Sequence, residues 1–150
     1  DLSVPAARAA IENAGLTPAD IDAIICCTVT PDQLLPASAN LIQGQRGANH
    51  AASYDLNAAC SGFVYGLATA NAYISSGLFE NVLVIGAEQL SSITNYEDRN
   101  TCVLFGDGAG AALLAAPYGR RSARGQNDEQ SGSASLAYSF MKIPFASMSS

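Results

Sequence analysis

Apolar residues follow two different spacings along the first 116 residues, and the two spacings alternate. Between residues 4 and 14, apolar side chains recur at intervals of three and four, which predicts an amphipathic helix with Ser3 as its N-cap. Similar spacing predicts helices over residues 37–46 and 60–76. A glycine follows each of these segments and can end the helix. Gly62 and Gly66 are poor helix formers, and their presence predicts that the helix over residues 60–76 packs closely against another backbone and is buried at the centre of the fold.

Between the helices lie short apolar runs that lack the alternation of a half-exposed strand. Such runs cover residues 23–29, 81–86 and 109–114, and residues 52–56, with two polar side chains, are predicted as a further strand that is also buried. Continuous apolar runs of this length are typical of strands covered on both faces. Helices that alternate with such strands predict a largely parallel sheet with right-handed crossovers, so the predicted fold class is α/β.

The last part of the chain has a different composition. After residue 117 the periodicity is lost, and Gly, Ser, Arg, Gln and Asn dominate. Residues 1–119 carry three basic and eleven acidic side chains, whereas residues 120–150 carry four basic and two acidic ones. We therefore expect a folded α/β unit over residues 1–117 and a separate, poorly ordered tail over residues 118–150.

Composition and charge argue against several classes of function. Hydrophobic residues make up 49% of the chain and charged residues 13%, which is typical of a buried α/β core. The net charge of −6 argues against a nucleic-acid partner, and no apolar run reaches the roughly 18 residues of a membrane span. One histidine and four cysteines without a Cys-x-x-Cys pair predict no metal site. The cysteines suit a reducing cytoplasm.

One cysteine lies in the turn between the predicted strand at residues 52–56 and the helix that follows. Cys60 is at the start of this predicted helix, near unpaired backbone N–H groups and the positive end of the helix dipole. Both stabilise a thiolate over a thiol. The same N–H groups could bind the oxygen that becomes negative when a thiolate attacks a thioester. The alternative is that Cys60 is a small buried residue of the core.

Other candidate motifs favour structural roles. Cys26 and Cys27 lie within an apolar run and are expected in the core. Glycines at positions 106, 108 and 110 resemble a dinucleotide-binding motif, but they lead into a strand and not from a strand into a helix. Asp107, between them, is expected to cap or bond the turn.

Three separated motifs carry a resemblance to a known family. They read DLNAACSGF at residues 55–63, DRNT at residues 98–101 and FGDGAGA at residues 105–111. With these motifs the chain, over residues 1–116, resembles the thiolase-like condensing enzymes, and within them the β-ketoacyl-acyl-carrier-protein synthase III family. The resemblance implies one half of a layered αβαβα fold with a mostly parallel mixed sheet.

The resemblance also implies an acyl transfer of type II fatty-acid biosynthesis. Cys60 would take an acyl group from acyl-CoA. The acyl-enzyme would then condense with malonyl-acyl carrier protein, releasing carbon dioxide and giving a β-ketoacyl product. Acyl-CoA is a substrate in this scheme, and no cofactor is implied. The family further implies a homodimer.

Three residues receive roles from the resemblance. Cys60 is implied as the nucleophile, with its own backbone N–H as one oxyanion donor. Arg99 matches an arginine near the coenzyme A nucleotide; the alternative is a surface ion pair with Glu97 or Asp98. Leu35 matches a loop position that reaches into the partner subunit's acyl pocket, and the alternative is an apolar loop anchor.

The chain also departs from the family pattern. The His and Asn that the family uses for decarboxylation have no match, and His50 lies in a loop and receives no role. The sequence resembles an internal piece of a longer protein, so for the isolated chain we expect weak acyl transfer to Cys60 without condensation. The alternatives are a polyketide- or quinolone-type synthase, a hydroxymethylglutaryl-CoA synthase, and a catalytically incomplete fragment that only dimerises.

Overall fold

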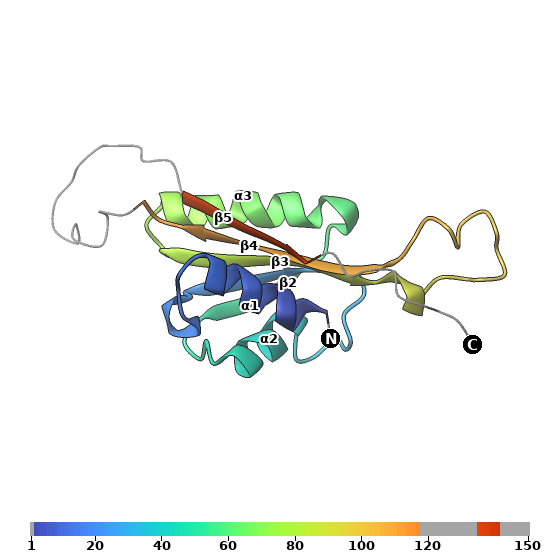
Figure 1. The fold of residues 1–150 in the computed structure, drawn as a ribbon, viewed down its shortest axis with the longest axis horizontal. Helices are drawn as coiled ribbons and strands as arrows, with labels where there is room; N and C mark the ends of the chain where they lie inside the picture. The colour runs from blue at the N-terminus through green and yellow to red at the C-terminus, as the bar shows by residue number, and fades with distance from the viewer. Residues whose placement is uncertain (1, 118–134, 142–150) are drawn as a thin grey trace, which may run out of the picture.

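Helices cover both faces of one sheet in the described part of the chain (Figure 1). The computed structural model describes residues 2–117 and, for the backbone, residues 135–141. Its helices and strands are α1 Ser3–Asn13, β1 Ala23–Cys27, α2 Ser38–Arg46, β2 Ala52–Leu56, α3 Gly62–Ser75, β3 Asn81–Gln89, β4 Asp107–Ala115 and β5 Ser135–Met141. Short 3-10 turns lie at η1 Pro18–Asp20, η2 Ala59–Ser61 and η3 Leu90–Ser92. The predicted α/β class is confirmed, and each helix and strand predicted within residues 1–117 is found. The expected burial of the strand over residues 52–56 is wrong, because every residue of β2 is exposed or half-buried.

The sheet of the described residues is mixed and has the strand order β2-β1-β3-β4-β5. β1 runs parallel to both of its neighbours, β2 and β3, whereas β4 is antiparallel to β3 and to β5. The carboxyl ends of β1, β2 and β3 therefore meet at one edge of the sheet, where open α/β sheets bind their ligands.

The central strands supply the core on both faces of the sheet, because successive side chains point to opposite faces. On the face covered by α1 and α2, the buried strand residues are Ile24, Cys26, Leu83, Ile85, Ala111 and Leu113. On the face covered by α3 they are Ala23, Ile25, Cys27, Val82, Val84, Ala112 and Leu114. All of β1 is buried, which confirms both the doubly covered strand and the core positions of Cys26 and Cys27.

The predicted N-cap of the first helix is wrong. α1 already includes Ser3, and the N-cap position belongs to Leu2, which makes no side-chain cap hydrogen bond. A serine caps a helix from an extended backbone, whereas Leu2 has φ −86° and ψ −27°, so the helical conformation starts before Ser3. The predicted spacing of apolar residues is right, because α1 buries one face, made of Ala6, Ala7, Ala10 and Ile11.

Helix α3 packs very closely against the sheet. It begins at Gly62, two residues later than predicted, because the 3-10 turn Ala59–Ser61 precedes it. A Cβ placed on Gly66 would lie 2.7 Å from Cys27 Sγ and 2.8 Å from Val84 Cγ1, so only a glycine fits at this point. The close contact is found at Gly66, where side chains make it, whereas a Cβ on Gly62 would lie 3.5 Å or more from its neighbours.

The outer face of α3 is open. Among the described residues, α3 is the one helix on its side of the sheet (Figure 1), and Val64 and Tyr65 are 62% and 56% exposed. The expectation that this helix is buried at the centre of the fold is therefore wrong for this chain. An apolar helix pattern indicates what a helix can bury, and it does not say whether a covering layer is present.

Part of the predicted tail is described. Residues Ser135–Met141 form β5, which pairs antiparallel with β4. The remaining residues of that segment, 118–134 and 142–150, lie outside the described residues. The boundary at residue 117 and the poor order beyond it stay predictions.

Candidate active site

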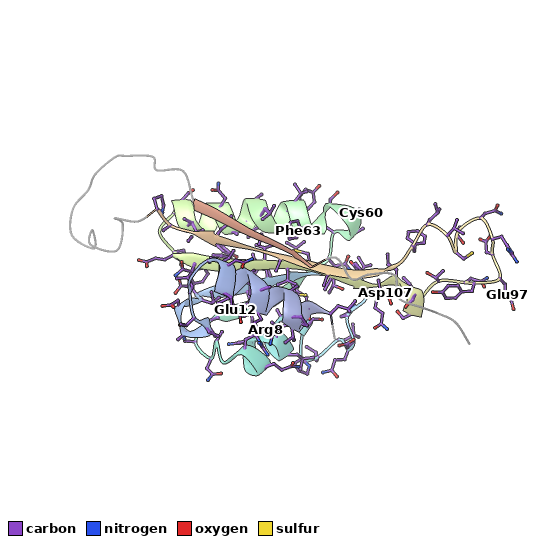
Figure 2. The ribbon with its side chains drawn as sticks, in the orientation of Figure 1. Arg8, Glu12, Cys60, Phe63, Glu97 and Asp107 are labelled. Atoms are coloured by element: carbon purple, nitrogen blue, oxygen red, sulfur yellow. The ribbon has the colours of Figure 1, made fainter. Side chains whose placement is uncertain are left out.

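Cys60 lies in the turn that leads from the carboxyl end of β2 into α3 (Figure 2). Ala59, directly before it, has φ +47°, a left-handed conformation that is rare for a residue with a Cβ. Backbone strain of this kind costs about 1–3 kcal/mol and clusters at functional sites. The turn leaves Cys60 exposed, which contradicts the alternative of a small buried core residue.

The two backbone N–H groups that follow Cys60 already have carbonyl partners, so the expectation of unpaired N–H groups beside Cys60 is wrong for these two. The turn is closed by hydrogen bonds from Ser61 N–H to the Ala58 carbonyl (3.2 Å) and from Gly62 N–H to the Ala59 carbonyl. Neither of these bonds uses the N–H of Cys60. The 14-residue helix α3 starts directly after the turn and directs the positive end of its dipole toward it. An anion held at this place, such as the oxyanion of an acyl transfer, is therefore favoured.

The two cysteines of β1 have different surroundings from Cys60. Burial raises the pKa of Cys26 to about 12 and the pKa of Cys27 to about 11, and the negative charges of Asp55 and Glu88 add to both shifts. Both thiols therefore stay protonated at neutral pH and are poor nucleophiles. Of these three cysteines, Cys60 is the one placed for chemistry.

Leu35 lies in the loop that leaves the carboxyl end of β1, at the same sheet edge as the Cys60 turn. Leu34 and Leu35 are 88% and 85% exposed. Such exposure contradicts the alternative in which Leu35 is an apolar loop anchor. In this chain the side chain is free to contact another molecule.

Arg99 lies in the long excursion between β3 and β4. The neighbouring Asp98 carboxylate accepts hydrogen bonds from Asn100 N–H (3.0 Å) and from the Thr101 hydroxyl (2.8 Å), and these bonds lower the pKa of Asp98. Among the described residues, no ion pair joins Arg99 to Glu97 or Asp98. The guanidinium of Arg99 is therefore not paired with these two acidic neighbours in the described part of the chain.

The three predicted site residues lie in three different connections: Leu35 between β1 and α2, Cys60 between β2 and α3, and Arg99 between β3 and β4. In Figure 2, Glu97, two residues before Arg99, lies at the outer end of the excursion, whereas Cys60 lies in the turn that precedes α3. A cavity of about 330 Å³ opens on the α1 face of the sheet, and none of the three lines it. Its lining includes Ser3, Thr28, Thr30, Ser38, Glu88 and Asp107.

Two acidic residues that received no role from the sequence hold the loop of Leu35. Glu88, on β3, and Asp55, on β2, accept hydrogen bonds from the loop backbone and from the start of α2. A carboxylate within or directly after a buried strand is the signal that could have found them. Such a charge needs hydrogen-bond donors nearby, because its desolvation is otherwise costly.

The remaining polar candidates have structural settings. Asp107 accepts hydrogen bonds from the Ser91 hydroxyl (2.6 Å) and Ser91 N–H (2.9 Å), which lower its pKa and tie together the two ends of the excursion. His50 is exposed in the loop before β2. Within the described ranges, no three His, Cys, Asp or Glu side chains are grouped to hold a metal ion. None of the helices described combines the length and apolar character needed to cross a bilayer.

Known proteins share the motifs of this chain. The family model of 3-oxoacyl-[acyl-carrier-protein (ACP)] synthase III matches residues 54–129, which include the Cys60 turn. A β-ketoacyl-[acyl-carrier-protein] synthase III from Sinorhizobium medicae is 58% identical over 118 residues, which are 79% of this chain and 36% of the relative. One from Caldanaerobacter subterraneus is 54% identical over 114 residues, 76% of this chain and 34% of the relative.

Solved structures share the fold. The 3-oxoacyl-[acyl-carrier-protein] synthase III from Aquifex aeolicus has a TM-score of 0.76 and 47% identity, over 77% of this chain and 38% of that one. The priming β-ketosynthase of the R1128 polyketide pathway has a TM-score of 0.74 and 38% identity, over 76% of this chain and 34% of that one. The sheet and the cysteine turn thus assign this chain to the thiolase-like condensing enzymes. Within that class, the chain belongs to the 3-oxoacyl-[acyl-carrier-protein] synthase III family, and it spans about a third of the length of the curated relatives it matches.

Proposed function

We propose that this chain supplies the acyl-accepting cysteine of a β-ketoacyl-acyl-carrier-protein synthase III, an acyltransferase of type II fatty-acid biosynthesis. The observation that carries the proposal is Cys60, exposed in a strained strand-to-helix turn inside the segment that the family model matches. The names of the most similar relatives support the substrate class.

The proposed reaction has two steps. The Cys60 sulfur attacks the carbonyl carbon of an acyl-CoA thioester, the bond from that carbon to the coenzyme A sulfur breaks, and the coenzyme A thiolate leaves. The N–H group of Cys60, in the turn before α3, and the positive end of the α3 dipole stabilise the oxygen that becomes negative. Malonyl-acyl carrier protein then loses carbon dioxide, and the carbanion that results attacks the acyl carbon. This attack frees the Cys60 thiolate and gives β-ketoacyl-acyl carrier protein.

The second step needs side chains that we place outside this chain. The His and Asn that promote decarboxylation are proposed to belong to the part of the relatives' length that this chain does not span. The isolated chain is therefore expected to accept an acyl group weakly and not to condense it. Coenzyme A enters only as the thioester substrate, and the proposal includes no metal or organic cofactor.

Arg99 and Leu35 are proposed as substrate-binding residues. The guanidinium of Arg99, unpaired with its acidic neighbours among the described residues, suits the phosphates or adenine of coenzyme A. Leu35 is exposed enough to enter the acyl pocket of a second copy. A homodimer is supported by β2, an edge strand of the described sheet with partly exposed residues, since a free strand edge can pair with another chain.

We further propose that the enzyme is cytoplasmic and binds neither membranes nor nucleic acids. The polyketide-type alternative is less well supported, since the R1128 priming ketosynthase is 38% identical in the shared fold and the Aquifex aeolicus synthase III is 47% identical. A fragment that only dimerises makes a different chemical prediction, because it would leave Cys60 unacylated.

The test is the intact mass of the chain after incubation with acetyl-CoA. We expect one added acetyl group on the wild-type chain and none on Cys60→Ala. Cys102→Ala is the matched control, because Cys102 is a partly exposed thiol outside the turn, and this variant should keep the adduct. An adduct that persists in Cys60→Ala refutes the nucleophile. A folded wild-type chain that stays unmodified favours the dimerising fragment.

A further inference from the structure

The loop of residues 28–37 connects the carboxyl end of β1 to α2 and carries Leu34 and Leu35. These two side chains are 88% and 85% exposed, so their own packing does not hold them in place. A side chain that must meet a substrate accurately needs support from the groups around it. Here that support has to come from the two ends of the loop.

The first end of the loop is held by Glu88, near the end of β3. Its carboxylate accepts hydrogen bonds from Val29 N–H at 3.0 and 3.2 Å, from the Thr30 hydroxyl at 2.6 Å and from the Thr28 hydroxyl at 3.4 Å. The Thr30 hydroxyl oxygen in turn accepts a hydrogen bond from Gln89 N–H at 2.8 Å. One carboxylate therefore ties three consecutive residues to the neighbouring strand.

The second end of the loop is held by Asp55, on β2. Its two carboxylate oxygens accept hydrogen bonds from Ser38 N–H and Ala39 N–H, each at 2.8 Å. These N–H groups belong to the first turn of α2 and have no partner within the helix. A carboxylate at a helix N-terminus is also favoured by the helix dipole. Asp55 therefore fixes the point at which the loop becomes a helix.

The two carboxylates flank the strand from which the loop emerges. β1 lies between β2 and β3, and Asp55 is the register partner of Cys26. Gly86 is the register partner of Cys27 at the end of β1, and Glu88 lies two residues after Gly86 on β3. The loop is thus attached on both sides of β1 by hydrogen bonds to charged groups, which are stronger than bonds between neutral groups.

We propose that Asp55 and Glu88 are positioning residues, which hold loop 28–37 in one conformation and thereby set where Leu35 meets the acyl group. The inference rests on the proposed function, in which Leu35 of one copy enters the acyl pocket of a second copy, where the family resemblance implies that it limits the length of the acyl chain. Part of the selection of acyl-chain length is thereby assigned to two carboxylates that do not touch the substrate.

The experiment compares Glu88→Gln and Asp55→Asn with the wild-type chain, since both changes keep the side-chain shape and remove the charge. Asp32→Asn is the matched control, because Asp32 is an exposed carboxylate of the same loop that accepts none of the anchoring bonds. Leu35→Ala shows the effect of losing the side chain itself. Two quantities are measured: hydrogen–deuterium exchange of the peptide over residues 28–39, and the ratio of octanoyl to acetyl labelling of Cys60 by the two acyl-CoA thioesters.

We expect exchange at Val29, Ser38 and Ala39 to rise at least about tenfold in the affected variants, because the broken hydrogen bonds protect these amides. Asp32→Asn should exchange like the wild type. The octanoyl-to-acetyl ratio should rise in Glu88→Gln and Asp55→Asn, in the same direction as in Leu35→Ala.

Unchanged exchange in Glu88→Gln and Asp55→Asn overturns the inference. It is also overturned if the loop of these variants exchanges faster while their octanoyl-to-acetyl labelling ratio stays at the wild-type value. If neither thioester labels any chain, the proposed function fails, and the exchange data alone decide whether the carboxylates hold the loop. If a variant does not fold, Thr30→Val provides the test, because it removes the 2.6 Å hydrogen bond to Glu88.

Discussion

Cys60 is exposed because the residue before it turns the chain sharply. β2 ends at Leu56, Ala59 at φ +47° opens the 3-10 turn Ala59–Ser61, and α3 begins directly after that turn. Cys26 and Cys27 are held in the straight, buried strand β1, where burial raises their pKa to about 12 and about 11. The exposed Cys60 and the buried thiols of β1 therefore differ in access to reagents, which makes their reactivities separable.

We expect iodoacetamide at neutral pH to alkylate Cys60 in the folded chain and to leave Cys26 and Cys27 unmodified, because buried thiols are protonated and out of reach. Peptide mass mapping over time measures the modified fraction at each cysteine. Unfolding in urea is the control and should make all of them reactive. Alkylation of Cys26 as fast as Cys60 in the folded chain would contradict the assigned burial.

The raised pKa values of the β1 thiols also predict how stability depends on pH. In the folded chain these values are about 12 and about 11, above the ordinary 9.0, so the folded state holds its thiol protons more tightly than the unfolded state. The resulting stabilisation is complete below about pH 9 and is lost as the pH rises toward about 11 or 12. We expect the thermal midpoint to fall above about pH 9, and to fall less steeply in Cys26→Ala. Equal slopes in both chains would refute the linkage.

At the scale of elements, the contact between α3 and the sheet is set by a glycine. A Cβ on Gly66 would lie within 2.7 Å of Cys27 Sγ and 2.8 Å of Val84 Cγ1, both on β strands. A Cβ on Gly44, inside α2, would have no neighbouring atom within 4 Å. Gly66 and Gly44 therefore differ in how closely they are packed and not in their intrinsic helix propensity.

Gly66→Ala is expected to lower the free energy of unfolding by about 1–3 kcal/mol, because the added methyl overpacks the contact. Gly44→Ala is the matched control and should raise it by up to about 1 kcal/mol, because alanine is the better helix former. Urea unfolding followed by circular dichroism measures both. A Gly66→Ala chain as stable as Gly44→Ala would show that α3 can move away from the sheet.

At the scale of the whole molecule, the sequence pattern predicts what each element buries better than what covers it. The strand Ala23–Cys27 could be predicted, because a run without polar residues has no solvent face. The bond between Val29 and Glu88 could not, since 59 positions separate them and only the pairing of β1 with β3 brings them together. The position of the Cys60 turn could be predicted from the sequence. The left-handed conformation of Ala59 could not, because no residue type at this position indicates a positive φ.

The open outer face of α3 predicts self-association of the isolated chain. Val64 and Tyr65 are 62% and 56% exposed, and apolar patches of this kind bind dyes and other chains. We expect binding of anilinonaphthalene sulfonate and a mass that rises with concentration in size-exclusion chromatography with light scattering. Val64→Lys should reduce both, whereas Asn71→Lys, at an exposed polar position of the same helix, should not. Equal effects of the two lysines would assign the change to charge alone.

The central claim is that the sulfur of Cys60 accepts the acyl group, and the most direct measurement is fragment mass spectrometry of peptides from the chain after a brief reaction with acetyl-CoA. We predict an acetyl group on the peptide that contains Cys60, removable by neutral hydroxylamine as a thioester is. Acetylation confined to Cys102 or to amines, with Cys60 unmodified in a folded chain, would contradict the account.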